Sequence, residues 1–408
     1  MTLKTETRLL RAEPANDKGF SSLAVPVTRA STIVFPTCDA FERRYEQFYD
    51  GYTYGLYGTP TSRTLEARIS ELYAAEYCLC LPSGQSATAL ALSALLKAGD
   101  RVLVPTSAYG STRTFCTEVL ASFGVEVALY DPTIASGIGA LIDDRTRVVV
   151  VESPGSNTME IQDIPAIVQA AHASGGRVLA DNTWASALHC NPLDLGADIV
   201  MEALSKHAGG HADVLIGALV TRDEVLFRRL KDVSRLMGLG VSADDASLVL
   251  RGLQTMPLRL EREGTSALTL AHWLAARPEV ARVLHPALPG DPGHILWQRD
   301  FQGASGLFSV ELAPQYQDCT SVFVDALRVF RIGASWGSTH SIVTPQSAFR
   351  LTAAPGSTPG KFIRFSIGLE PVEDLQADIE AALMSLSAGT VPGAQERVVH
   401  QRELQKEE

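Results

Sequence analysis

The chain has 408 residues, of which 46% are hydrophobic and 20% are charged. That length exceeds one ordinary hydrophobic core, so we expect two domains with room for an additional arm. The formal net charge of −11 and the isoelectric point near 5.4 argue against a nucleic acid or an anionic membrane as a partner.

The sequence shows no targeting or membrane segment. Its first twenty residues contain no apolar signal-peptide core, and no run approaches the ~20 apolar residues that a membrane helix needs. The cysteines form neither a CxxC pair nor a disulfide-framework spacing, standing at Cys38, Cys78, Cys80, Cys116, Cys190 and Cys319. We therefore expect reduced thiols and a cytoplasmic location.

Residues 1–55 alternate polar and turn-forming stretches, with several aromatic residues and little regular periodicity. Such a segment is expected to be an arm that packs on another body rather than a domain of its own.

Residues 56–242 show short apolar strands that alternate with helical stretches. Helices are expected over 64–75, over 85–99 with closure by a C-terminal glycine, and over 164–175. Continuous Val- and Leu-rich strands between helices are typical of a parallel sheet buried on both faces. These strands are expected at 77–84, 101–105, 125–131, 147–154, 177–183, 198–206 and 214–221.

Long helices dominate the start of the region 243–408, and a second, smaller α/β region follows. Its strands are expected near 306–312 and 362–369, and residues 389–408 are expected to form a charged helix with a frayed end. The sequence thus predicts an α/β fold with an arm over 1–55, a large domain over 56–242 and a small domain over 243–408.

Polar residues at the carboxyl ends of the strands matter most, because ligands of such sheets gather there. Gly84 and Gln85 follow one strand and open a helix, where free N–H groups and the helix dipole can bind an anion, although a plain strand–helix turn has the same pattern. Asp181 ends a buried strand, where a carboxylate is costly unless it meets a cation, a metal or a donor. A helix N-cap role explains Asp181 equally well.

Lys206 stands 25 residues after Asp181 (206 − 181), among small residues. A desolvated lysine can form a Schiff base, whereas most lysines are surface charges. Together, a phosphate cradle, an acid and an amine at neighbouring strand ends match the needs of pyridoxal 5′-phosphate (PLP).

Dispersed motifs in a characteristic order make the match specific. They include "TPTSRTLEARISEL", "LPSGQSATAL", "VESPGSNTMEIQD", "LADNTWAS", "SKHAGGHADVLIG", "DPGHILWQRDFQGASGLFS" and "ASWGSTHS". In these segments the chain resembles the Cys/Met-metabolism PLP-dependent enzymes of fold type I, in their cystathionine β-lyase branch. The resemblance implies a large domain with a mostly parallel seven-stranded sheet and a smaller C-terminal α/β domain.

The resemblance also implies a role toward the cofactor for each matching residue. Lys206 is expected to hold PLP covalently and later to move the substrate Cα proton. Asp181 is expected to pair with the pyridine nitrogen, and Tyr109 to stack on the ring. The phosphate is expected to be held by the amides of Gly84 and Gln85 and by the hydroxyl of Ser205.

The substrate side of the site follows from the same resemblance. Arg364 is expected to clamp the substrate carboxylate bidentately. Ser335 and Trp336 are expected to line the pocket, with a structural role for Trp336 as the alternative. Tyr54 is expected to act with Lys206 and Tyr109 in catalysis, reaching the phosphate of a neighbouring subunit. Such sharing requires a dimer, and the family implies a homotetramer built as a dimer of dimers.

Three positions depart from the family pattern. Leu56 stands where many relatives carry an arginine that contacts the neighbouring phosphate, so either cofactor binding is weaker or Arg63 compensates. Ala334 and His340 replace a frequent Tyr and Glu, and both are expected beside the pocket.

The implied reaction is α,β-elimination of L-cystathionine, or of a related S-substituted L-cysteine, to a thiol (homocysteine), pyruvate and ammonia. The alternatives are a γ-lyase or γ-synthase on the same scaffold, and a protein that holds PLP without turnover. His207 and His211 are four apart, as in helical metal sites, but the Gly-Gly between them is poor helix material and no HExxH pattern is present. We therefore expect no metal.

Overall fold

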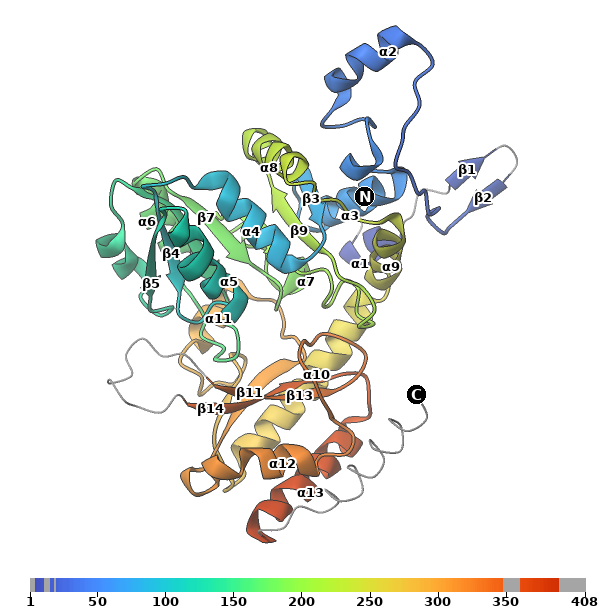
Figure 1. Ribbon diagram of the computed structural model, residues 1–408. Helices are drawn as coiled ribbons and strands as arrows, with labels where there is room; N and C mark the ends of the chain where they lie inside the picture. Colours follow the sequence, from blue (N-terminus) through green and yellow to red (C-terminus); the bar gives the residue numbers. More distant parts are fainter. Residues whose placement is uncertain (1–3, 11–14, 18–19, 348–359, 389–408) are drawn as a thin grey trace, which may run out of the picture.

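The computed structural model describes residues 4–10, 15–17, 20–347 and 360–388. The N-terminal segment holds short elements only, and Figure 1 shows α2 projecting away from the rest of the chain. These elements are α1 (Thr5–Leu10), β1 (Ala15–Asp17), β2 (Phe20–Ser22), α2 (Cys38–Glu42) and two 3-10 turns (Arg43–Gln47 and Gly55–Tyr57). No helix among the described residues is long and apolar enough to cross a membrane.

A seven-stranded sheet follows, in the order β3-β9-β8-β7-β6-β4-β5. Its strands are β3 (Tyr77–Leu81), β4 (Arg101–Pro105), β5 (Glu126–Tyr130), β6 (Thr146–Glu152), β7 (Arg177–Asp181), β8 (Ile199–Glu202) and β9 (Gly217–Thr221). All pairings are parallel except those of β9 with β3 and β8. This confirms the predicted mostly parallel sheet.

Helices cover both faces of the large sheet, as its doubly apolar strands require. On one face, α3 (Pro60–Leu72), α6 (Ile164–Ala173) and α9 (Ala243–Leu253) share a core with the sheet. On the other, α4 (Gly84–Leu95), α8 (Glu224–Leu236) and the turn over Phe115–Leu120 that continues α5 (Gly110–Thr114) share a second core. The short helices η4 (Ala135–Leu141) and α7 (Ser186–His189) lie in connections.

The expected closure of the helix over 85–99 by Gly99 is wrong. Helix α4 ends at Leu95, because Leu96 already has extended backbone. Gly99 has a φ of +87° in the turn that follows, where its N–H donates to the carbonyl of Gly124. Gly99 thus shapes the turn before β4 rather than the helix end.

The second sheet has five strands, in the order β10-β11-β14-β13-β12. They are β10 (Val280–Leu284), β11 (Leu307–Leu312), β12 (Arg331–Ile332), β13 (Ile342–Ser347) and β14 (Lys361–Ser366), and only β12 and β13 pair in parallel. The helices are α10 (Met256–Ala275), α11 (His294–Asp300), the 3-10 helix Pro314–Cys319, α12 (Thr320–Ala326) and α13 (Val372–Ala388).

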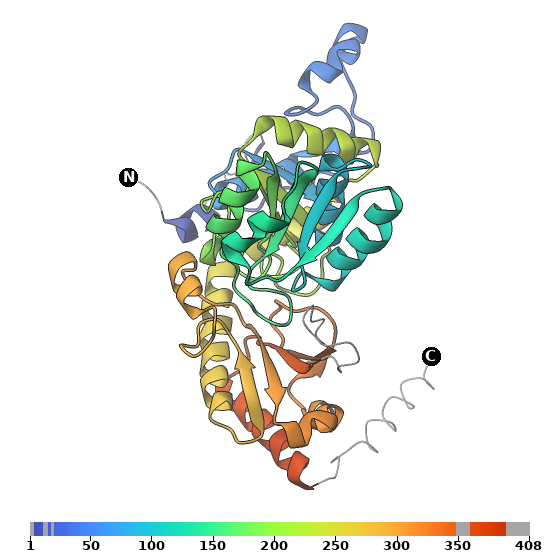
Figure 2. The same ribbon diagram turned by 90° about the vertical axis from the view of Figure 1, so that its left-hand side faces the viewer.

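Helices α10, α12 and α13 bury their apolar faces on this second sheet, which lies below the large sheet in Figures 1 and 2. The strands predicted at 306–312 and 362–369 are therefore confirmed, whereas the helix predicted over 389–408 lies outside the described residues. The domain limits at residues 55 and 242 stay a prediction.

Asp378 fixes the segment that leads into β12. Its carboxylate is buried and accepts the backbone N–H groups of Arg328 and Val329 at 2.8 Å each and of Phe330 at 3.2 Å. We predict that Asp378→Ala lowers the free energy of unfolding by about 3 kcal/mol, because buried donors are left unpaired. Glu380→Ala removes only a partly exposed ion pair, 3.7 Å to Arg277, and should cost less than about 1 kcal/mol. Chemical denaturation measures both changes, and equal losses would contradict this assignment.

Candidate active site

A cavity of about 610 Å³ opens at the carboxyl ends of the parallel strands, facing the second sheet. Residues from β14 and from the loop after β12 complete its wall. Nine of the ten predicted site residues line it, namely Gly84, Gln85, Tyr109, Asp181, Ser205, Lys206, Ser335, Trp336 and Arg364. Only Tyr54 does not.

The N-terminus of α4 forms one end of the cavity. Ser83 is the N-cap, and its hydroxyl accepts the N–H of Ser86 at 3.0 Å. The first N–H groups of the helix, those of Gly84 and Gln85, have no intrahelical acceptor and can bind an anion. A Cβ on Gly84 would lie 2.7 Å from the Cβ of Ala203, so only glycine allows this close approach of helix and strand end.

Lys206 lies in the loop after β8 and carries the amine of the site. Its Nζ contacts the hydroxyl of Ser335 and lies 5.4 Å from the centroid of the Trp336 ring. Burial lowers the pKa of Lys206 to about 8, helped by the positive charge of Arg364 and opposed by Asp181. A large fraction of this amine is therefore uncharged at mildly alkaline pH.

Asp181 ends β7 and lies on the cavity wall. One carboxylate oxygen accepts both the N–H of Thr183 at 3.0 Å and its hydroxyl at 2.6 Å. Burial raises the pKa of Asp181, and the two bonds from Thr183 and the charge of Lys206 counter that rise. The two bonds from Thr183 therefore fix the orientation of the Asp181 carboxylate, which can bind a positively charged group in the cavity.

Arg364 lies on β14 and is only 6% exposed. Its guanidinium donates to Asn157 Oδ1 at 3.1 Å and to the carbonyl of Ser335 at 3.0 Å. Ser335 has a φ of +81°, an unfavourable conformation for serine that this bond helps to hold. Burial lowers the pKa of Arg364 to about 10. A buried guanidinium of this kind suits a substrate carboxylate.

Ser205 and Tyr109 border the cavity, and each already makes hydrogen bonds within the chain. The Ser205 hydroxyl donates to the carbonyl of Ile216 at 3.1 Å and accepts the N–H of Ile216 at 2.9 Å, so this hydroxyl must rotate before it can donate to a phosphate. Tyr109 precedes α5 and is 49% exposed, and its side chain borders the cavity. Its N–H donates to the carboxyl of Glu152 at 2.6 Å.

Sequence reasoning missed Glu152, Thr183 and Asn157. Glu152 ends β6 and lines the same cavity as Asp181. The reason that singled out Asp181, a carboxylate at the end of a buried strand, applies equally to Glu152 and could have found it. Thr183 and Asn157 act through hydrogen bonds that have no sequence signal of their own.

Tyr54 lies in a different groove, with Ala30, Ser31, Leu56 and Gly240. Its ring is 43% exposed, and its hydroxyl lies 3.4 Å from that of Ser31.

The departures from the family pattern differ in position. Arg63 is paired with Glu66 at 3.1 Å and does not line the groove of Tyr54. Ala334 lines the cavity as expected, but His340 is exposed and is absent from the cavity wall. His340 therefore does not line the pocket itself, although Ser338 and Ile342 on either side of it do.

The two histidines beside Lys206 do not converge. His207 is 1% exposed and hydrogen-bonds the carbonyl of Trp184 at 3.1 Å, and burial lowers its pKa to about 3. His211 is exposed and bonds the carbonyl of Gly209 at 2.7 Å. Across the described ranges, no group of three or more His, Cys, Asp or Glu side chains is arranged to hold a metal ion.

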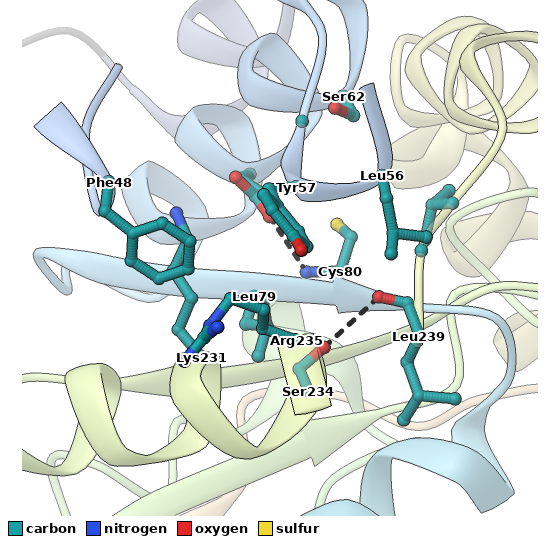
Figure 3. Close-up of a pocket in the computed structure, with 14 residues that line it drawn as sticks. Phe48, Leu56, Tyr57, Ser62, Leu79, Cys80, Lys231, Ser234, Arg235 and Leu239 are labelled. Carbon is teal, nitrogen blue, oxygen red and sulfur yellow. Dashed lines mark hydrogen bonds between the residues drawn. The ribbon is translucent and has the colours of Figure 1, made fainter. Parts of the chain in front are cut away.

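Lys231 is the rival amine, because burial also lowers its pKa to about 8. Figure 3 shows it on α8 in a small pocket with Phe48 and Tyr57. Its Nζ donates to the carbonyl of Tyr49 at 2.7 Å, and the pocket volume is only about 30 Å³, too small for a pyridine ring. Lys231 is thus a structural lysine.

The residues of the large cavity fit PLP. The free N–H groups of Gly84 and Gln85 suit its phosphate, Asp181 suits its ring nitrogen, and the weakly basic amine of Lys206 suits its aldehyde. The side-chain oxygen of Gln85 is buried without a partner among the described residues, but it is an acceptor, so the donors for the phosphate are the main-chain N–H groups.

Comparison with known proteins agrees with this fit. The profile of the Cys/Met metabolism PLP-dependent enzymes matches residues 6–384. A Rhizobium johnstonii protein provisionally named cystathionine β-lyase is 44% identical over 92% of this chain and 94% of its own length. An L-alanine/L-glutamate racemase of Wolbachia pipientis is 36% identical over 94% of this chain and 98% of its own length.

A solved structure of cystathionine γ-synthase from Xanthomonas oryzae is also similar. It has a TM-score of 0.86 and 30% identity, with coverage of 96% of this chain and 100% of its own. The chain therefore belongs to the Cys/Met metabolism PLP-dependent enzymes, as its motifs predicted, and PLP is its cofactor.

Proposed function

We propose that this enzyme is a carbon–sulfur lyase of the cystathionine β-lyase type, which eliminates the thiol from L-cystathionine or a related S-substituted L-cysteine. The observation that carries the proposal is the meeting of Lys206, Asp181 and Arg364 in one cavity. The β-lyase name of the relative at 44% identity supports the substrate class. With cystathionine and one water, the products are homocysteine, pyruvate and ammonia.

In the proposed mechanism, Arg364 binds the α-carboxylate and thereby fixes the Cα–H bond toward Lys206. When bound, PLP supplies an electron-withdrawing ring that acidifies this Cα–H. The uncharged amine of Lys206 takes the Cα proton, and the Ser335 hydroxyl holds that amine in place. The Cβ–S bond then breaks, and the sulfur leaves with the electron pair and takes up a proton. Positioned proton transfer contributes ~10²–10⁴-fold to such a step.

Racemisation is the second candidate, favoured by the relative named L-alanine/L-glutamate racemase. It shares removal of the Cα proton but returns a proton to the other face without loss of a Cβ substituent. A γ-elimination, suggested by the γ-synthase structure, would instead give 2-oxobutyrate. The three reactions therefore differ in their products.

We predict that the PLP-loaded enzyme converts L-cystathionine to pyruvate and homocysteine in equal amounts. Lys206→Ala should lower the rate at least about a hundredfold, because the proton acceptor is lost, whereas exposed Lys97→Ala should not change it. Coupled lactate dehydrogenase detection and chromatography identify the keto acid. Formation of 2-oxobutyrate, or of D-alanine from L-alanine without keto acid, would assign one of the other reactions.

We predict that Lys206 titrates well below an ordinary lysine. Because burial disfavours its charged form, the amine should lose its proton as the pH rises through about 8. Competitive acetylation of the cofactor-free protein, followed by peptide mass spectrometry, should show half-maximal labelling of Lys206 near that pH, with exposed Lys97 as the internal standard. Half-maximal labelling of Lys206 only near pH 10 would refute the burial argument.

We also propose that Tyr54 completes the site of a second copy, in a homotetramer built as a dimer of dimers. Lys206→Ala and Tyr54→Ala should each be nearly inactive alone. After dissociation and reassembly together, they should recover about a quarter of wild-type activity, since half of the dimers are hybrids with one intact site. Absence of recovery, with hybrids shown by native mass spectrometry, would place Tyr54 outside the partner's site.

A further inference from the structure

Glu152 and Asp181 form a side-by-side carboxyl pair in the cavity wall. Each is the last residue of its strand, and the two are direct partners in the parallel register of β6 and β7. Adjacent strands lie ~4.8 Å apart, and paired residues present their side chains on the same face. Both side chains line the same cavity.

Two carboxyl groups so placed cannot both carry a full charge at low cost, so one of them keeps a proton. Burial, and next the charge of Asp181, raise the pKa of Glu152 well above its usual range. The N–H of Tyr109 and the guanidinium of Arg113 lower this pKa. Asp181 also faces Lys206 and Glu202.

Hydrogen bonds decide which carboxyl group is charged. Asp181 accepts two donors from Thr183, at 3.0 and 2.6 Å. The Thr183 hydroxyl itself accepts the N–H of Ala203 at 3.0 Å, so its single proton points to Asp181. Among the described residues, the Glu152 carboxyl accepts one hydrogen bond, from the N–H of Tyr109. The negative charge is therefore better stabilised on Asp181.

We propose that Glu152 is a positioning residue that keeps the proton of this pair, so that Asp181 stays ionised, while its carbonyl-type oxygen holds the backbone of Tyr109. This inference rests on the proposed role of Asp181 toward the pyridine nitrogen. The hydrogen bond from the N–H of Tyr109 to Glu152 also fixes the start of α5, because Tyr109 is the residue before that helix. Arg113 holds the same turn by donating to the carbonyls of Thr106 and Ala108.

Four variants test the proposal through the dissociation constant of PLP from the cofactor-free protein, measured by fluorescence titration. Glu152→Gln should change it less than about threefold, because a neutral amide keeps the acceptor for Tyr109. Thr183→Val should weaken binding about tenfold or more, since charge can then move to Glu152. Thr183→Ser keeps the hydroxyl and serves as the conservative control. The double variant Thr183→Val/Glu152→Gln should return to within about threefold of wild type, because no competing carboxyl remains.

A merely structural role for Thr183 does not predict this rescue. A double variant no better than Thr183→Val, or a tenfold loss in Glu152→Gln alone, overturns the proposal.

Infrared spectroscopy of the cofactor-free protein gives an independent result. At pH 7, the difference spectrum of wild type minus Glu152→Gln should contain a carboxylic-acid C=O band. Carboxylate bands in that difference spectrum instead would overturn the assignment. If wild type shows the band but binds no PLP, the proposed function fails while the inference stands.

Discussion

The amine of Lys206 is buried and still feels the negative charge of Asp181, and the rest of the site depends on this combination. Burial and the positive charge of Arg364 lower the pKa of Lys206 to about 8, and the negative charge of Asp181 opposes this effect. A lysine in water would be charged and unreactive at neutral pH. The parallel sheet provides this combination, because the ends of β6, β7 and β8 gather on one edge beside the first turn of α4.

The second sheet supplies what the first cannot. Arg364 reaches the cavity from β14, and the loop before β13 brings Ser335 to the Nζ of Lys206. The bond from Arg364 to the carbonyl of Ser335 joins these two groups, so the guanidinium and the hydroxyl that contacts the amine of Lys206 are positioned together. The shape of the cavity therefore depends on how the two sheets face each other, and Asp378 holds the segment that leads into β12.

Strong local signals made much of this predictable. Apolar runs bounded by turn residues located the seven strands, and the chemistry of an amine, an acid and a helix N-terminus singled out Lys206, Asp181 and Gly84, which line one cavity. The closure of α4 was misplaced because a glycine in a turn and a glycine at a helix end look alike in sequence. That His340 stays off the cavity wall while Ser338 and Ile342 line it depends on the direction of each side chain in the loop, which has no sequence signal.

Other features depend on contacts that a sequence does not reveal. Thr183 matters through one hydroxyl proton whose direction is set by the N–H of Ala203, 20 residues away. The engaged hydroxyl of Ser205 and the position of Tyr54 outside the cavity likewise follow from packing. Lys231 is the most instructive case, because burial lowers its pKa to about 8, as it does that of Lys206. The two lysines differ in the volume of the cavity beside the amine, which is about 610 Å³ at Lys206 and about 30 Å³ at Lys231.

Reduction of the PLP-loaded enzyme with borohydride, followed by peptide mass spectrometry, tests the central claim most directly. The account predicts one phosphopyridoxyl group per chain on the peptide that contains Lys206, and none on the peptide that contains Lys231. The group on Lys231, or on no lysine, would contradict it.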